Sequence, residues 1–241
     1  MTDYTLSDAT RQKLMGVSAA TICTALFKRG LRNQFIQDVH PVGPFRGNMV
    51  GQAYTMRYIP AREDLNPLSV FQDPSHPQRA GVEAIPAGCV MVIDSRKDAR
   101  AASAGSILMT RMMKRGVAGV VTDGGFRDAP EIGALDMPSY HNRPSAPTNL
   151  TLHQAIDLNV PIGCGDAPVF PGDVIVGDGE GVVVIPANIA DEIAEEAFEM
   201  TAYEDFVTEQ VQGGATIVGL YPATKAENLT KFTAWRKANS R

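Results

Sequence analysis

The chain has 241 residues, of which 44% are hydrophobic and 20% charged, and its formal net charge is −5. This composition is typical of a folded globular protein, and no Lys/Arg-rich run offers the basic patch that nucleic-acid binding requires. No stretch reaches the roughly 20 apolar residues of a membrane span, the first four residues lack an apolar signal core, and the three cysteines show no CxxC spacing. We therefore expect one cytoplasmic domain over residues 1–241, without a nucleic-acid or membrane partner.

The first third of the chain predicts helices, then a strand, then a polar excursion. Residues 6–31 have helical periodicity, and Ser7 and Ser18 are suitable N-caps for two successive helices. Residues 49–59 alternate as a strand does. Residues 60–80 are rich in Pro, Asp, Asn and Ser, and excursions of this length often bind a ligand.

The centre of the chain predicts a strand, a helix and a second strand. Residues 88–94 and 117–121 are short apolar runs typical of buried strands, and residues 104–115 between them have helical spacing. The second strand runs into residues 122–128, which form a sharp and highly charged turn. Residues 138–147 are expected to be irregular.

The last third predicts a hairpin followed by a long helix. Residues 160–164 form a short strand, and residues 174–176 and 182–185 are strands joined by a Gly-rich turn. A helix begins at Pro186, continues to about residue 211 and ends at two glycines. The expected fold class is therefore α/β, with N-terminal helices and a C-terminal helical extension around one core.

The richest chemistry lies around the central helix and the turn after the second strand. Gly105 precedes the helix, whose free N–H groups favour an anion. Arg127 offers a planar fork suited to a carboxylate, and Asp128 offers hard oxygen ligands suited to Mg²⁺ or Mn²⁺. Together these groups suit a 2-oxo acid chelated by a metal. The alternative interpretation is that Arg127 and Asp128 form a weak surface ion pair.

Two long segments resemble the signatures of one family. They are GSILMTRMMKRGVAGVVTDGGFRD at residues 105–128 and PGDVIVGDGEGVVVIP at residues 171–186. Both are similar to the 4-hydroxy-4-methyl-2-oxoglutarate / 4-carboxy-4-hydroxy-2-oxoadipate aldolase family, which includes the regulator of ribonuclease E activity A (RraA). The resemblance extends over most of the chain, including the N-terminal helices and the strand at residues 51–55.

The resemblance implies a fold, an assembly and roles for particular residues. The fold would be a compact β/β/α sandwich like the swivelling phosphohistidine domain, assembled as a homotrimer or hexamer with sites at subunit interfaces. Asp128 would hold Mg²⁺ or Mn²⁺ largely through waters, with Glu204 of a neighbouring subunit approaching the metal. The residues implied to bind substrate are Gly105, Ser106, Ile107, Leu108 and Arg127.

The function that follows is metal-dependent cleavage of a carbon–carbon bond in a 2-oxo acid, by a class II aldolase or an oxaloacetate decarboxylase. One residue departs from the family pattern, because Ser106 stands where aldolase members usually carry an acid. A serine hydroxyl cannot carry the charge of that acid. Two alternatives therefore stay open: a non-enzymatic regulator that binds a ribonuclease, and a metal-dependent dehydratase of a sugar-acid derivative.

Other polar residues carry weaker signals. Arg57, Arg62 and Arg79 could each bind a second carboxylate, although solvated or structural charges are more common. Asp94 and Asp123 end the two central strands, where ligand sites often gather. The four histidines share no metal-ligand spacing; they are His40, His76, His141 and His153.

Overall fold

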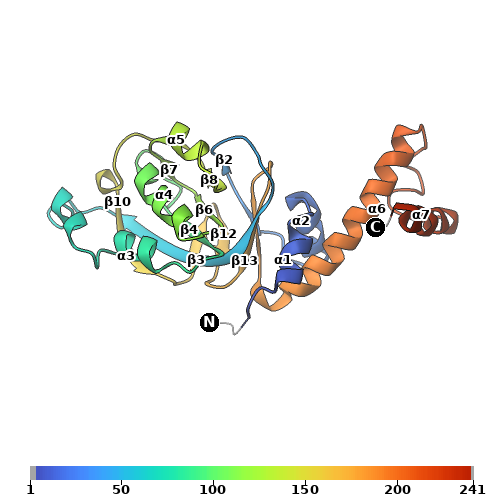
Figure 1. Ribbon diagram of the computed structural model, residues 1–241, viewed down its shortest axis with the longest axis horizontal. Coiled ribbons are helices and arrows are strands. Elements are labelled where there is room, and N and C mark those ends of the chain that lie inside the picture. The colour runs from blue at the N-terminus through green and yellow to red at the C-terminus, as the bar shows by residue number, and fades with distance from the viewer. Residues whose placement is uncertain (1–3, 240–241) are drawn as a thin grey trace.

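A curled mixed sheet forms the centre of the protein, which we describe from a computed structural model of residues 4–239 (Figure 1). Residues 1–3, part of the polar start considered above, lie outside the described residues. The sheet has nine strands in the order β1-β14-β13-β3-β4-β6-β8-β2, and β10 pairs with β3. Their bounds are β1 (Phe35–Ile36), β2 (His40–Pro41), β3 (Met49–Pro60), β4 (Cys89–Asp94), β6 (Gly119–Thr122), β8 (Ser139–His141), β10 (His153–Leu158), β13 (Val174–Gly177) and β14 (Val182–Ile185).

Two small sheets complete the strand framework. One is a parallel sheet in the order β5-β7-β9, and the other is the antiparallel hairpin β11-β12. Their bounds are β5 (Ala102–Ala104), β7 (Gly125–Phe126), β9 (Arg143–Pro144), β11 (Ile162–Cys164) and β12 (Ala167–Val169).

The central strands are buried on both faces, which explains their nearly continuous apolar sequences. In β4, Val90 and Val92 face the inside of the curled sheet, together with the β11-β12 hairpin. Met91 and Ile93 face the opposite way, toward a helical layer. Side chains of successive strand residues alternate between two faces, so this one strand contributes to two hydrophobic clusters.

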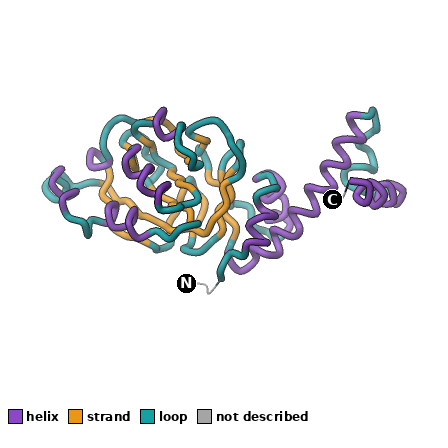
Figure 2. The backbone as a smooth tube through the Cα atoms, viewed as in Figure 1, coloured by secondary structure: helices purple, strands orange, loops and turns teal. Residues whose placement is uncertain are grey.

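Helices cover the outer face of the sheet in two groups (Figure 2). One group packs on β3, β4 and β6, and the other packs on β13 and β14. The first comprises α3 (Pro77–Ala84), α4 (Ser106–Lys114) and α5 (Ala129–Gly133), and the second comprises α1 (Asp8–Leu14), α2 (Ala19–Lys28) and α6 (Ala190–Gln212). Single turns of 3-10 helix occur at η1 (Leu68–Gln72), η2 (Asn149–Thr151) and η3 (Ala187–Ile189).

The far end of α6 projects beyond the sheet as an arm (Figure 1). α7 (Ala226–Asn239) folds back against it. Phe232 and Trp235 of α7 pack against a small buried cluster formed by Phe206 and Val207 of α6 and Leu220 of the connection between the helices. Within residues 4–239, no helix is both long and apolar enough to cross a membrane.

Several predicted elements are confirmed. Ser7 and Ser18 cap α1 and α2 by accepting hydrogen bonds from the Thr10 and Thr21 N–H groups, each at 3.1 Å. β13 and β14 form the predicted antiparallel hairpin. The long helix extends to Gln212 and ends at Gly213, as its sequence indicates, but it begins at Ala190, after the 3-10 turn η3, and not at Pro186.

The predictions for residues 104–115, 122–128 and 138–147 need correction. The helix begins only at Ser106, because Ala104 belongs to β5, which pairs with β7 inside the supposed turn. The supposed irregular segment contains β8 and β9. These strands have two or three residues each, too few to show a period of two, and their pairing with distant strands specifies them.

A buried histidine in β8 predicts a measurable pH dependence of stability. His141 is 6% exposed and its ring stacks on Phe126, with the centroids 5.7 Å apart. Burial, followed by the nearby His40, lowers the pKa of His141 to about 4. This value is below that of an unfolded histidine, so the stabilisation is complete above about pH 6.5 and is lost as the pH falls towards 4.

Replacing His141 with phenylalanine should remove this dependence while keeping an aromatic ring against Phe126. Between pH 7 and pH 4 the wild-type free energy of unfolding should fall by up to about 3 kcal/mol more than that of His141→Phe. Urea unfolding at both pH values measures the difference. An identical pH dependence in the two proteins would contradict the prediction.

Candidate active site

Two short parallel strands place most of the predicted site residues side by side. β5 leads into Gly105 and α4, and its neighbour β7 leads into Arg127, Asp128 and α5. Because parallel strands end at the same edge of a sheet, the connection from β5 to α4 lies beside the connection from β7 to α5. The Arg127 N–H donates a hydrogen bond to the Ala104 carbonyl at 3.1 Å, which holds the two connections at this spacing.

At Gly105 the two connections, which join β5 to α4 and β7 to α5, approach each other closely. A Cβ atom built there would lie 2.8 Å from Arg127 Cγ and 3.0 Å from Asp128 Oδ2. Such contacts are too short for any larger residue unless the two side chains move. The glycine therefore allows the arginine and the aspartate to lie over the start of α4.

Asp128 is held by its backbone and by the start of α4. Its φ of 57° is left-handed, a conformation that Asp tolerates better than most residues, and it caps the short helix α5. Its Oδ2 accepts hydrogen bonds from the Ser106 N–H at 3.1 Å and from the Ser106 hydroxyl at 3.2 Å. Its Oδ1 lies 3.7 Å from Arg127 Nε and faces no shorter polar contact among the described residues.

Arg127 and Asp128 form the ion pair that the alternative interpretation expects, but the pair is loose. Their side chains remain 48% and 38% exposed, and a partly solvated pair contributes little to stability. The terminal nitrogens of Arg127 have no hydrogen-bond partner in the described part of the chain. Both groups therefore keep donors and acceptors available for a ligand.

The start of α4 supplies fewer free N–H groups than its sequence suggests. The Ser106 N–H binds Asp128, and the Leu108 N–H returns to the Gly105 carbonyl at 3.1 Å. The Ile107 N–H has no partner among the residues described here, and the Ile107 side chain is 82% exposed. An anion bound at this helix start would therefore meet one uncommitted N–H group.

A cavity of about 470 Å³ opens over these residues. Gly105, Ile107, Leu108, Arg127 and Asp128 line one part of it. The rest of the lining comes from β5, η1, α3 and the residues that begin η2. The volume suits a small molecule of metabolite size.

The rest of the lining adds two polar residues that the sequence did not single out, Gln78 of α3 and Asn149 of η2. It also includes Arg79, one of the three candidate arginines. The other two are paired elsewhere, Arg57 with Asp157 and Arg62 with Asp64 at 2.7 Å. The polar excursion at residues 60–80 is thus part of the cavity wall.

Glu204 lies elsewhere in the chain. Its Oε2 accepts a hydrogen bond from the Thr21 hydroxyl at 2.8 Å, and its Oε1 accepts one from the Tyr221 hydroxyl at 3.2 Å. It does not line the cavity of its own chain. Its contribution to a neighbouring subunit's site stays a prediction.

Asp128 is the residue that fits a divalent metal at this site. Among the described residues, no three His, Cys, Asp or Glu side chains gather closely enough to hold a metal by themselves. A single carboxylate with one uncommitted oxygen suits Mg²⁺, which keeps several waters and often uses only one or two protein carboxylates. The donor set thus fits a hydrated hard cation completed by the substrate.

Asp123 has a structural position away from the cavity. It accepts backbone hydrogen bonds from Ser95 at 2.7 Å and from Lys97 and Gly165 at 3.1 Å each. Burial raises the pKa of Asp123 to about 6 and also raises the pKa of Asp94. Neither aspartate lines the cavity of Arg127 and Asp128.

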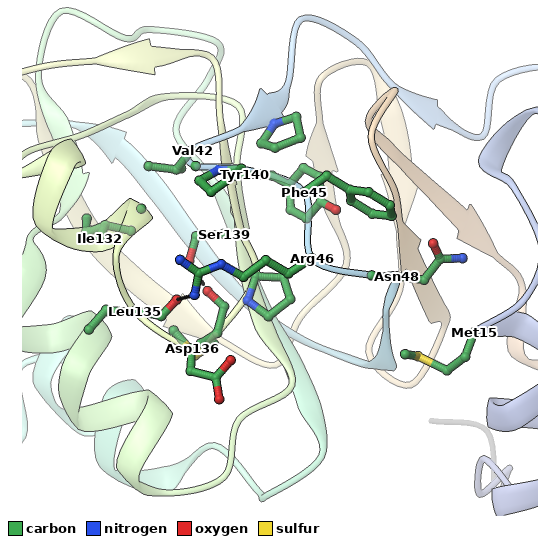
Figure 3. A pocket seen from close by; sticks show the side chains of 17 residues that line it. Met15, Val42, Phe45, Arg46, Asn48, Ile132, Leu135, Asp136, Ser139 and Tyr140 are labelled. Carbon is green, nitrogen blue, oxygen red and sulfur yellow. Dashed lines mark hydrogen bonds between the residues drawn. The ribbon is translucent and has the colours of Figure 1, made fainter.

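A second cavity lies between the chain at residues 41–48 and the chain at residues 132–140 (Figure 3). It holds about 160 Å³ and shares no lining residue with the first. Arg46 reaches the Leu135 carbonyl across it at 3.5 Å. Its lining includes Arg46 and Asp136 but none of the residues predicted to bind the substrate or the metal, so we place the candidate active site in the first cavity.

Curated proteins resemble about half of this chain. A protein of Halalkalibacterium halodurans, named provisionally as a 4-hydroxy-4-methyl-2-oxoglutarate aldolase, is 35% identical over 127 residues, which are 53% of this chain and 60% of that protein. A protein of Ectopseudomonas mendocina with the same provisional name is 32% identical over 43% of this chain and 63% of its own length. These matches span less than two thirds of either relative.

Solved structures resemble the fold as a whole. Streptomyces coelicolor RraAS2, described as an unusual member of the RNase ES inhibitor RraA protein family, has a TM-score of 0.73 and 27% identity, covering 83% of this chain and 96% of that one. A protein from Pseudomonas syringae has a TM-score of 0.77 over 90% of this chain and all of its own, with 21% identity. The family model described as Aldolase/RraA matches residues 19–184 and includes the whole segment from Gly105 to Asp128. The chain therefore belongs to the Aldolase/RraA family.

Proposed function

We propose that the chain is a divalent-metal-dependent carbon–carbon lyase of 2-oxo acids. It would release pyruvate by retro-aldol cleavage of substrates like 4-hydroxy-4-methyl-2-oxoglutarate, by decarboxylation of oxaloacetate, or by both. The observation that carries the proposal is the convergence of Arg127, Asp128 and the start of α4 on one cavity. The provisional aldolase names of two relatives support the reaction class.

Each group has a distinct task in this proposal. A bound Mg²⁺ or Mn²⁺, held by Asp128 largely through waters, would supply Lewis-acid stabilisation of negative charge on the keto oxygen. Arg127 binds the adjacent carboxylate through its planar fork and shares the developing charge. The Ile107 N–H donates to the same anionic end at the helix start. Ser106 fixes the orientation of Asp128.

The decisive assay is pyruvate release from oxaloacetate and from a panel of 4-hydroxy-2-oxo acids, with and without Mg²⁺ or Mn²⁺. Metal-dependent pyruvate formation from at least one member of the panel is expected. Failure to release pyruvate from every member, in a preparation shown to be folded, would overturn the proposal.

Two other functions stay open. The similarity to RraAS2, whose description names an RNase ES inhibitor family, favours a regulator that binds a ribonuclease. Ser106, which stands where aldolase members usually carry an acid, leaves open a metal-dependent dehydratase of a sugar-acid derivative. Inhibition of a ribonuclease without pyruvate release would support the first, and release of a dehydrated sugar acid would support the second.

The arm formed by α6 and α7 supports a homo-oligomer. It projects from the sheet (Figure 1) and exposes Ile217, Val218 and Leu229, which are 58%, 71% and 50% exposed. Burying such side chains against a second copy would remove apolar surface from water. Light scattering should show a trimer or hexamer, and a stable, active monomer would contradict this expectation.

A further inference from the structure

A third cavity, of about 590 Å³, lies away from the candidate active site. Its lining comes from the connection between α2 and β1, the connection between β10 and β11, the residues from β12 to β13, and the start of η3. It shares no lining residue with the cavity of Arg127 and Asp128. Leucine, phenylalanine and several prolines make most of the wall apolar, so the few polar groups determine which ligands it can bind.

Gln34 supplies this cavity with a buried amide that lacks a partner. The residue is 7% exposed, and its Oε1 accepts no hydrogen bond from the described residues. Its backbone is held in place, because the Gln34 carbonyl accepts a hydrogen bond from the Val184 N–H of β14 at 2.8 Å. An unsatisfied buried acceptor is costly, and such groups usually signal a missing water or ligand.

Asp173 brings an unpaired negative charge to the same cavity. It is 7% exposed, and its two carboxylate oxygens accept one backbone hydrogen bond each, from Phe170 at 2.9 Å and from Ala187 at 3.1 Å. A carboxylate oxygen can accept two hydrogen bonds, so both oxygens keep capacity for a ligand. Burial raises the pKa of Asp173, and no Lys or Arg within residues 4–239 forms an ion pair that would stabilise its charge.

These groups favour a positively charged ligand with N–H donors. The cavity lining contains no basic residue, so Asp173 leaves it with a net charge of −1. Gln34 Oε1 and the Asp173 carboxylate are both acceptors, and the ligand must therefore supply the donors. Phe170 also lines the cavity and is 55% exposed, and the face of an aromatic ring attracts a cation. A hydrated metal ion would gain nothing from the apolar wall, whereas an alkyl chain would.

We infer that this cavity binds a small organic cation, an alkylammonium or alkylguanidinium ion. The charged head donates hydrogen bonds to the Asp173 carboxylate and to Gln34 Oε1, which the side chain presents by rotation about its broad terminal torsion. The alkyl chain packs against the proline-rich wall, and the Phe170 ring contacts the cation. The site is separate from the proposed reaction and does not depend on it.

Binding measurements with simple cations test the inference without turnover. Calorimetry at neutral pH and low salt compares butylammonium and butylguanidinium with 1-butanol, which has the same chain but no charge. The wild type should bind each cation at least about 10-fold more tightly than the alcohol, the effect of one charge-assisted hydrogen bond. Bound cation should also raise the Tm, as expected for a ligand of the folded state.

A third probe distinguishes a free small molecule from an arginine of a partner protein. Nα-acetylarginine amide carries the same guanidinium on a peptide backbone, and the peptide groups have no partners in a mainly apolar cavity. It should therefore bind more weakly than butylguanidinium. Tighter binding of the arginine derivative would overturn the assignment to a small molecule.

Gln34→Leu separates a ligand contact from a structural role. Leucine removes the buried unpaired amide, so the Tm should stay constant or rise, while the affinity for butylammonium falls about 5- to 10-fold. Gln37→Leu is the matched control, because Gln37 is exposed and lies outside the cavity, and it should keep the affinity. Asp173→Asn should abolish the preference for a cation; its Tm is measured in parallel, because Asp173 also binds two backbone N–H groups.

Two results would overturn the inference. One is a wild type that binds 1-butanol as tightly as butylammonium, and the other is a Gln34→Leu variant that binds butylammonium with unchanged affinity. Release of pyruvate, or its absence, does not affect either comparison, so this inference and the proposed reaction stand or fall separately.

Discussion

Replacing Asp128 with asparagine should lower kcat/KM by about 1000-fold or more, because a Lewis-acid metal supplies several kcal/mol of transition-state stabilisation. Asparagine keeps the size of the side chain, tolerates the left-handed backbone at φ 57° and can still accept the hydrogen bonds from Ser106. It loses the negative charge that a divalent cation requires. Alanine should also abolish activity, but it adds backbone strain at this position.

Metal removal gives an independent measurement of the same prediction. Excess EDTA should abolish pyruvate release by the wild type, and Mg²⁺ or Mn²⁺ should restore it. Asp136→Asn is a suitable control, because Asp136 is exposed and lines the separate cavity. Full turnover in EDTA, or an Asp128→Asn variant as active as the control, would show that Asp128 holds no catalytic metal.

Local sequence signals correctly predicted the N-caps of α1 and α2, the end of α6 and the β13-β14 hairpin. The Ser7 and Ser18 hydroxyls that cap α1 and α2 bind N–H groups only three residues further along the chain. The strands of the β13-β14 hairpin are likewise close together in the sequence. Such interactions need no knowledge of the rest of the chain. The first family signature, at residues 105–128, likewise contains the connections that carry Arg127 and Asp128.

Strand pairings between distant segments could not be predicted from the sequence. β7 consists of Gly125 and Phe126, and it becomes a strand because β5 and β9 lie on either side of it. A two-residue strand contains no periodicity, so its sequence cannot be told from that of a turn. The small sheet that aligns Gly105 with Arg127 was therefore unpredictable in detail.

The sequence also could not show which of the candidate arginines lines the cavity. Three arginines were equivalent candidates for a second carboxylate, and only the folded chain separates them. Arg57 and Arg62 each form an ion pair with an aspartate, whereas the Arg79 guanidinium lies over the Phe71 ring and Arg79 lines the cavity. Charge and spacing along the sequence carry no information about which acids lie nearby in space.

Arg127→Lys isolates the contribution of the guanidinium fork. The Cγ and Cδ atoms of Arg127 pack over Gly105, and lysine retains both methylene groups and the positive charge. The Arg127 N–H bond to the Ala104 carbonyl belongs to the backbone and is unaffected. What lysine cannot reproduce is bidentate binding of a carboxylate.

We expect Arg127→Lys to lower kcat/KM by about 100-fold or more, on the scale of losing one oxyanion-stabilising donor. Loss of charge stabilisation confined to the transition state would lower kcat, whereas loss of carboxylate anchoring would raise KM, so steady-state kinetics separate the two roles. Arg111→Lys, on the exposed face of α4 and paired with Glu83, should be close to wild type. If Arg127→Lys matched Arg111→Lys on every substrate turned over, the chemistry would lie elsewhere, and the ribonuclease-regulator function would become the better account of this cavity.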